Sequence, residues 1–195
     1  MTSLDAIRQV VRAAGDEPIV ASLGHPAYDL FAAGDRPANF YTWGSMGLAS
    51  SIGLGLALAQ PGKRVYVLDG DGSLLMNLGS LATIGWTRPA NLVLIVLDNE
   101  RYATTGGQDT ATAHGADLEA AARAMGLTAA ATVRSADALA EVLARTPNAP
   151  GPWTIVAKVD RSTPTTKPPL DCVFIKQRFM AAIGCAESAT AGGPA

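Results

Sequence analysis

The stretch that decides the fold is Arg64-Val65-Tyr66-Val67-Leu68-Asp69-Gly70-Asp71-Gly72-Ser73. Its first half is an apolar run typical of a strand that is buried on both faces, and its second half is a turn rich in glycine and aspartate. A second apolar run, residues 91–97, ends in Asp98-Asn99. Because continuous apolar strands occur in parallel sheets covered by helices, the two runs predict neighbouring strands of an α/β domain.

The rest of the chain alternates between strand-like and helix-like segments, which predicts one three-layer α/β domain over residues 1–186 with a mainly parallel sheet. The Ala/Gly/Ser-rich residues 187–195 are expected to form a disordered tail. Ligands of such sheets bind beyond the carboxyl ends of the strands, so the loops 24–26, 69–73 and 98–108 should gather at one edge. Further strands are expected at 18–23, 39–42, 127–133 and 153–159, and helices at 3–14, 28–31, 46–59, 74–86, 117–125, 135–145 and 171–183. Residues 100–115 are expected to form a long polar loop, and residues 160–170 an extended segment.

The composition excludes several classes of protein. Charged residues make up only 16% of the chain and hydrophobic residues 48%, and a large buried interface is one explanation for that balance. With a net charge of −2 the chain lacks the excess of basic residues that is typical of nucleic-acid-binding proteins. The two cysteines, Cys172 and Cys185, are expected to be buried thiols of a cytoplasmic protein. The apolar run 46–59 is too short to span a bilayer and predicts a buried helix, so no membrane association is expected.

The turn after the first apolar run carries the first chemical signal. Gly70 and Gly72 let the backbone approach a ligand closely, and Ser73 is expected to open a helix whose free N–H groups favour a phosphate. Asp71 offers a hard oxygen that suits Mg²⁺. Asn99 follows 28 residues later, after the next strand, and with the backbone carbonyl of Arg101 it would complete the protein ligands. Read alone, both aspartate and asparagine are also ordinary turn residues.

Together these motifs resemble the signature of thiamine-diphosphate-dependent enzymes, in which Gly-Asp-Gly precedes Asn-Asn or Asp-Asn by a similar interval. Three further stretches resemble the branch that contains the sulfopyruvate decarboxylase β subunit and phosphonopyruvate decarboxylase. They are Asn39-Phe40-Tyr41-Thr42-Trp43-Gly44-Ser45-Met46-Gly47, Leu74-Leu75-Met76-Asn77-Leu78-Gly79 and Thr105-Gly106-Gly107-Gln108. The resemblance extends over about residues 4–183.

This resemblance implies a thiamine-diphosphate-binding fold with Mg²⁺ between Asp71, Asn99 and the Arg101 carbonyl. It implies that Gly44 and Met46 hold the aminopyrimidine, with Met46 as the apolar wedge that bends the cofactor, and that Gly24 and His25 contact the diphosphate. The cofactor-binding residues expected on this basis are Gly24, His25, Gly44, Ser45, Met46, Gly70, Asp71, Gly72, Ser73, Asn99 and Arg101.

The resemblance also implies a partner. In the family, an activating glutamate comes from a separate pyrimidine-binding domain. None of the five glutamates of this chain lies in a similar context, so no catalytic residue is assigned within it. We therefore expect a hetero-oligomer in which an α subunit completes the active site.

The implied reaction is decarboxylation of a small 2-oxo acid to an aldehyde and CO₂. A sulfonate or phosphonate group on the substrate would need a cation, for which the candidates are Arg101, Arg178 and Lys167. His114 is a further candidate for a residue near the substrate. A carboligase or biosynthetic variant, a 2-oxoacid:ferredoxin oxidoreductase β subunit and an inactive cofactor-binding subunit are the alternatives.

Overall fold

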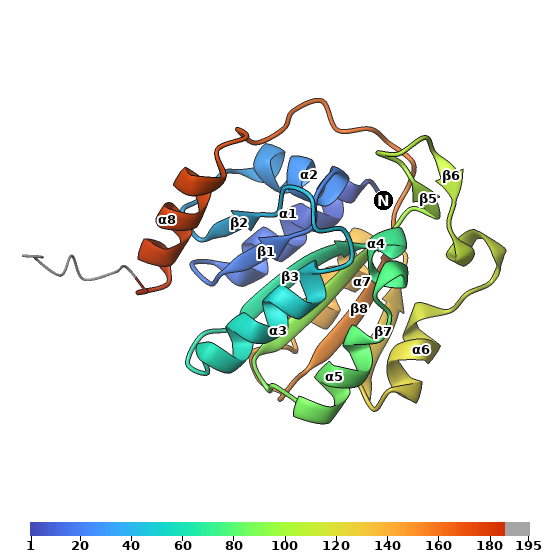
Figure 1. The fold of residues 1–195 in the computed structure, drawn as a ribbon. Helices are drawn as coiled ribbons and strands as arrows, with labels where there is room; N and C mark the ends of the chain where they lie inside the picture. The colour runs from blue at the N-terminus through green and yellow to red at the C-terminus, as the bar shows by residue number, and fades with distance from the viewer. Residues whose placement is uncertain (186–195) are drawn as a thin grey trace, which may run out of the picture.

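A six-stranded sheet, entirely parallel, forms the centre of the computed structural model, which describes residues 1–185 (Figure 1). The strand order is β2-β1-β3-β4-β8-β7, so the two runs with chemical motifs, β3 and β4, are adjacent and central. The strands are β1 (Ile19–Ala21), β2 (Asn39–Tyr41), β3 (Val65–Gly70), β4 (Leu92–Asp98), β7 (Ala129–Val133) and β8 (Trp153–Lys158). The predicted α/β class with a mainly parallel sheet is confirmed. The tail predicted for residues 187–195 lies outside the described residues.

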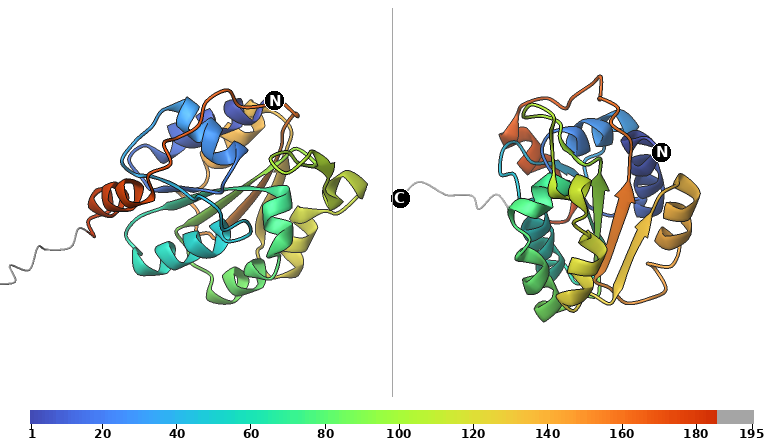
Figure 2. Two further views of the ribbon diagram at one scale, coloured as in Figure 1. Left: turned by 45° about the horizontal axis from the view of Figure 1, so that its top comes forward. Right: turned by 90° about the vertical axis from the view of Figure 1, so that its right-hand side faces the viewer.

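Helices cover both faces of the sheet and make the three layers that the alternation predicted (Figure 2). One face carries α1 (Ser3–Ala14), α2 (His25–Ala33) and α7 (Ala136–Leu143). The other carries α3 (Ala49–Ala59), α4 (Asp71–Met76), α5 (Ser80–Thr87) and α6 (Leu118–Ala124). The last helix, α8 (Cys172–Ala182), lies beside the edge strand β2 and contributes Ile175 to the first core and Phe179 to the second.

Strand β4 shows why this arrangement follows from the sequence. All seven of its residues are buried. Val93, Ile95 and Leu97 pack in the core beneath α1, α2 and α7, whereas Leu92, Leu94 and Val96 pack beneath α3 to α6. Successive side chains of a strand point to opposite faces, so a strand covered on both sides has to be apolar at nearly every position.

Three segments differ from the sequence-based expectation. The helix predicted for 74–86 is two helices, α4 and α5, separated at residues 77–79. The polar loop 100–115 contains a hairpin of β5 (Arg101–Tyr102) and β6 (Gln108–Asp109), followed by the short 3₁₀ helix η1 (Ala111–His114). The helix predicted for 46–59 begins only at Ala49, and it is buried on one side alone, with Leu58 53% exposed.

The cysteines were predicted wrongly. Cys172 and Cys185 are both exposed free thiols, because Cys172 opens the exposed first turn of α8 and Cys185 follows the end of that helix. The first helix is capped by Thr2, with Asp5 completing a capping box, and Ser3 lies inside it. Over residues 1–185 the structure contains no helix with the length and apolarity needed to cross a bilayer.

Candidate cofactor and metal site

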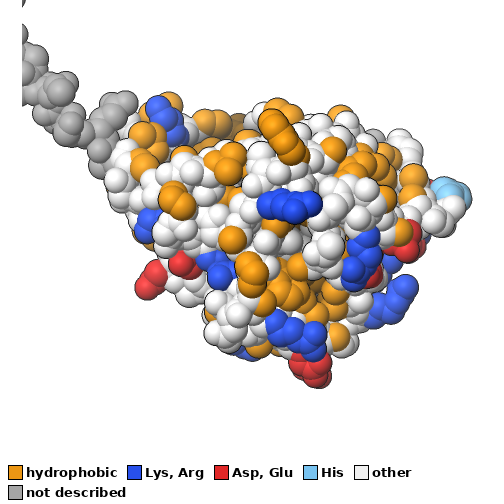
Figure 3. All heavy atoms as spheres, turned by 90° about the horizontal axis from the view of Figure 1, so that it is seen from below, with side chains coloured by type: hydrophobic (Ala, Val, Ile, Leu, Met, Phe, Trp, Pro, Cys, Tyr) orange, Lys and Arg blue, Asp and Glu red, His pale blue; other side chains and the backbone are white. Residues whose placement is uncertain are grey.

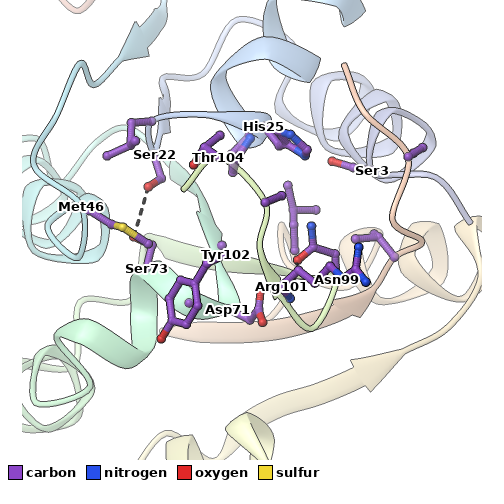
Figure 4. A pocket seen from close by; sticks show the side chains of 18 of the residues that line it. Ser3, Ser22, His25, Met46, Asp71, Ser73, Asn99, Arg101, Tyr102 and Thr104 are labelled. Carbon is purple, nitrogen blue, oxygen red and sulfur yellow. Dashed lines mark hydrogen bonds between the residues drawn. The ribbon is translucent and has the colours of Figure 1, made fainter. Parts of the chain in front are cut away.

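A cavity lies at the carboxyl edge of the sheet, where the loops after β1, β3, β4 and β8 meet (Figure 4). The loops 24–26, 69–73 and 98–108 therefore gather at one edge as the topology predicted. The residues that line the cavity are Ser3, Ser22, Leu23, His25, Pro26, Met46, Gly70, Asp71, Gly72, Ser73, Leu97, Asn99, Arg101, Tyr102, Ala103, Thr104, Val159, Asp160 and Ser162.

The three proposed metal ligands line this cavity together. In the sheet, Gly70 pairs with Leu97, so Asp71 and Asn99 follow the ends of neighbouring strands. Asp71 is only 1% exposed, and this burial raises the pKa of its carboxyl, to which the nearby charge of Asp98 also contributes. The side-chain oxygen of Asn99 accepts a hydrogen bond from the backbone N–H of Arg101 at 3.0 Å, a contact that folds residues 99–101 into a turn.

Two threonines that sequence reasoning missed hold the carboxylate of Asp71. The Thr110 hydroxyl lies 2.5 Å from its Oδ2, and the Thr112 hydroxyl lies 3.0 Å from the same atom. Thr112 also lies 2.9 Å from Oδ1 of Asp98, whose other oxygen is 2.7 Å from the ammonium of Lys158. These threonines are 39 and 41 residues from Asp71 in the chain, and threonine in a polar loop gives no sequence signal.

Ser73 connects this turn to the loop that is expected to hold the aminopyrimidine. Its hydroxyl accepts a hydrogen bond from the N–H of Gly47 at 2.9 Å and lies 3.1 Å from the hydroxyl of Ser22. Gly44, Ser45 and Gly47 all have positive φ, which for Ser45 (58°) is a strained backbone conformation. Met46 lines the cavity beside Ser73 (Figure 4), whereas Gly44 and Ser45 are exposed beyond its lining.

Asp69 is completely buried at the end of β3, next to the serine pair. The N–H of Gly70 donates to its Oδ1 at 3.0 Å, and within residues 1–185 its Oδ2 has no hydrogen-bond partner. Burial raises the pKa of this carboxyl to about 6. The group is therefore more easily protonated than an exposed aspartate, because burial disfavours its charged form.

The hairpin after β4 packs against Gly24 and against the turn that follows β3. A side chain at Gly72 would collide with the ring of Tyr102, at 2.4 Å from Cε1, and a side chain at Gly24 would lie 2.7 Å from Cγ2 of Thr104. Both glycines are therefore required by close contact with this hairpin. His25, the first residue of α2, lines the cavity, and burial lowers the pKa of its imidazole despite the opposing effect of Asp29.

The remaining candidates lie outside the cavity lining. Arg178 forms a two-pronged ion pair with Asp35, with nitrogen–oxygen distances of 2.6 and 2.9 Å. Lys167 is exposed on the segment before α8, and His114 is exposed at 73% beside Asp109. Of the four residues predicted to be near the substrate, only Arg101 lines the cavity.

The donors at this edge fit a divalent cation that is shared with a diphosphate. Within residues 1–185 no three His, Cys, Asp or Glu side chains cluster to hold a metal by themselves. A carboxylate, an amide oxygen and a backbone carbonyl are instead available from Asp71, Asn99 and Arg101. Mg²⁺ commonly takes few protein ligands and fills its octahedron with phosphate oxygens and water, so this set suits it.

Comparison with known proteins agrees with this geometry. Residues 26–157 match the family described as thiamine pyrophosphate enzyme, C-terminal TPP binding domain. The chain is 43% identical to sulfopyruvate decarboxylase subunit beta of Methanocaldococcus jannaschii, over 92% of this chain and 96% of that protein. It is 44% identical to phosphonopyruvate decarboxylase of Streptomyces viridochromogenes, over 72% of this chain and 35% of that protein.

A structural comparison gives the same result. The fold superposes with a TM-score of 0.70 on the X-ray structure of a putative thiamin diphosphate-dependent enzyme from Mycobacterium smegmatis, at 26% identity over 82% of this chain. This chain spans only 32% of that enzyme. The chain belongs to the thiamine pyrophosphate enzymes, and the part of it that matches is their C-terminal TPP-binding domain.

Proposed function

We propose that this chain is the cofactor-binding subunit of a decarboxylase that depends on thiamine diphosphate and Mg²⁺. Its substrate would be a 2-oxo acid with a sulfonate or phosphonate group, and its products an aldehyde and CO₂. The observation that carries the proposal is the match over nearly the whole length of a sulfopyruvate decarboxylase subunit beta. The phosphonopyruvate decarboxylase relative supports the same substrate class.

Each part of the site has a role in this proposal. Asp71, Asn99 and the Arg101 carbonyl would hold Mg²⁺, while Gly24, His25 and the turn from Gly70 to Ser73 would face the diphosphate. Gly44, Ser45 and Met46 would orient the aminopyrimidine. Thiamine diphosphate, when bound, supplies the carbon nucleophile and accepts the electrons left by the departing CO₂.

Arg101 is our candidate for recognition of the substrate anion. Its side chain is 41% exposed and lies 4.0 Å from the carboxylate of Asp109, so the ion pair is loose and the guanidinium can reorient. A guanidinium binds sulfonate and phosphonate oxygens through paired hydrogen bonds. The backbone of the same residue would face the cation.

A separate α subunit would complete the active site. Relatives that match over most of their length are named subunit beta, whereas the chain covers 35% of the sulfopyruvate decarboxylase of Methanosarcina acetivorans, which is not named as a subunit. No glutamate among residues 1–185 lines the cavity, so the activating glutamate would come from the partner. The free cysteines suit assembly in a reducing cytoplasm.

The surface for this partner would be the outer face of α3, α4 and α5. These helices and the loop before α3 contain no charged residue over residues 37–62 and 72–87; the exception is Asp71, the buried first residue of α4. Leu48, Leu58, Met76 and Trp86 are exposed there, Trp86 at 84%. Seen from below, hydrophobic side chains gather in several places on the molecule; acidic side chains lie mainly toward the border, and Lys and Arg side chains are scattered across the view, one of them near its centre (Figure 3). Depletion of charge is typical of the core of an interface.

Activity would be tested on the chain assembled with its α subunit. Aldehyde formation from sulfopyruvate, phosphonopyruvate and pyruvate would be measured with and without Mg²⁺ and thiamine diphosphate. Asp71→Asn should abolish turnover, whereas Asp137→Asn, a matched change at an exposed site on α7, should leave it unchanged. No turnover of any of these 2-oxo acids by the wild-type assembly would refute the decarboxylase proposal.

Assembly would be tested by placing a charge on the proposed interface. Trp86→Glu and Met76→Glu should prevent the heteromer from forming, as measured by light scattering after size exclusion. Ala13→Glu places the same charge on an exposed position of α1, in the opposite helix layer, and should not. Equal assembly of all three variants would show that the α subunit binds elsewhere.

A further inference from the structure

The contacts of Thr110 and Thr112 with Asp71 form a small buried network. Thr110 is 1% exposed and Thr112 is 6% exposed. Their hydroxyls lie 2.8 Å apart, and both are within 3.0 Å of Oδ2 of Asp71. Both threonines belong to the segment between the hairpin and α6, so that segment is tied directly to the carboxylate that follows β3.

The arrangement distinguishes the two oxygens of Asp71. Every side-chain hydrogen bond that Asp71 accepts among residues 1–185 falls on Oδ2. Each threonine hydroxyl carries one proton, and Thr112 is also within 2.9 Å of Asp98. At 2.5 Å, Thr110 is the closer donor to Asp71, and the single proton of Thr112 can be donated to either Asp71 or Asp98. Oδ1 is left for another partner.

We propose that Thr110 and Thr112 are positioning residues that hold Oδ2 of Asp71, so that Oδ1 alone binds the divalent cation. The inference rests on the proposed function, because it takes Asp71 as a ligand of the cation that holds the diphosphate. Mg²⁺ requires near-ideal octahedral geometry. Hydroxyl contacts on Oδ2 alone leave both lone pairs of Oδ1 free, which favours one-oxygen coordination by Asp71.

The same network positions a second candidate ligand. The N–H of Thr110 donates to the carbonyl of Glu100 at 3.2 Å, next to Arg101 at the start of the hairpin. Arg101 is in turn paired with Asp109 across the hairpin. The contact of Thr110 with Asp71 therefore fixes the carboxylate and the base of the hairpin relative to each other. Removing the hydroxyl should loosen both.

The test separates the hydroxyl from the shape of the side chain. Thr110→Val and Thr112→Val keep the shape and remove the hydroxyl, whereas Thr110→Ser and Thr112→Ser keep the hydroxyl. The full chain in complex with its α subunit would be saturated with thiamine diphosphate and titrated with Mg²⁺. Tryptophan fluorescence would report binding, because Trp43 directly precedes the residues expected to hold the aminopyrimidine. Electron paramagnetic resonance of Mn²⁺ in place of Mg²⁺ would report the coordination without any turnover.

The valine variants should raise the Mg²⁺ concentration for half-saturation by about tenfold or more, as changes next to metal ligands typically do. The serine variants should stay close to wild type, because they keep the hydroxyl. Should Thr110→Val fail to fold, Thr112→Val carries the test. Two results would overturn this inference while leaving the proposed function standing. One is half-saturation of the folded valine variants at the wild-type Mg²⁺ concentration. The other is Mg²⁺ binding by the serine variants that is as weak as binding by the valine variants. Absence of Mg²⁺-dependent binding in the wild-type complex would overturn the proposed function as well.

Discussion

Replacing Lys158 with methionine should destabilise the chain strongly, because it leaves a buried carboxylate without its counter-charge. The side chain of Asp98 is 2% exposed, and the ammonium of Lys158 lies 2.7 Å from its Oδ2. The remaining contacts of Asp98, from the Thr112 hydroxyl at 2.9 Å and the Glu100 N–H at 3.2 Å, are made through Oδ1. Methionine has a similar length but would leave Oδ2 unpaired.

The size of the effect follows from the burial of the pair. Breaking a buried ion pair on one side costs about 3–5 kcal/mol. Because Lys158 is 21% exposed and water can reach it, we take the lower end, about 3 kcal/mol. For a chain of this length each kcal/mol shifts the melting midpoint by about 2–4 °C, so Lys158→Met should lower it by roughly 6–12 °C.

A second substitution tests whether the unpaired charge of Asp98 causes the destabilisation. Asp98→Asn should destabilise the wild-type chain, because it weakens the contact with Lys158. In the Lys158→Met background the same change should stabilise, because it removes the unpaired charge. The family motif also occurs with asparagine at this position, so Asp98→Asn should retain Mg²⁺-dependent cofactor binding. Thermal unfolding of the four variants by circular dichroism would measure the coupling, and Asp98→Asn lowering the midpoint equally in both backgrounds would refute the reasoning.

Two other predictions concern buried positions. Burial raises the pKa of Asp69 to about 6, so the unfolded chain releases this proton first, and stability should fall as the pH rises from about 4 to about 6. Asp69→Asn should reduce the change of the melting midpoint with pH over this window. The same pH dependence in Asp69→Asn and wild type would contradict the assignment of this titration to Asp69. In α5, a side chain at Gly85 would lie 1.9 Å from the backbone carbonyl oxygen of Met125, so Gly85→Ala should cost more than about 3 kcal/mol. Gly55→Ala, in open space on α3, should instead stabilise by up to about 1 kcal/mol, and equal urea midpoints for these two variants would show that the packing argument fails.

The sheet and the position of the cavity could be predicted because they depend on local pattern. Apolar runs that end in polar turns specify buried parallel strands, and the carboxyl ends of such strands meet at one edge. The break between α4 and α5 could not be predicted in this way. The side chain of Asn77 donates to the carbonyl of Gly47 at 2.9 Å, a contact with a loop 30 residues earlier. This tertiary bond stabilises the interruption of a stretch that reads as one helix.

The support of the site was also beyond local pattern. Position 98 carries a buried aspartate, whereas the family motif can have asparagine there, so its negative charge needs a nearby cation. Lys158 is that cation, and it lies at the end of β8, the next strand in the sheet. Nothing in the sequence around Lys158 distinguishes it from a surface lysine. Thr110 and Thr112 are similar, because only the fold of the hairpin brings them to Asp71. The ligands of a site can be found from a motif, but the residues that orient them depend on contacts across the fold.

The strained loop before α3 and the uncharged helix face adjoin each other. Ser45 has a φ of 58°, a conformation that a non-glycine residue adopts at a cost of about 1–3 kcal/mol. Leu48, three residues later, is 44% exposed and begins the uncharged face. Strain and exposed apolar surface both raise the free energy of an isolated chain. A partner that covers the face would remove the exposed apolar surface, and it would close over the loop from which Met46 enters the cavity. On the proposed function, residues 44–48 would contact both the cofactor and the partner, so cofactor binding and assembly should be coupled.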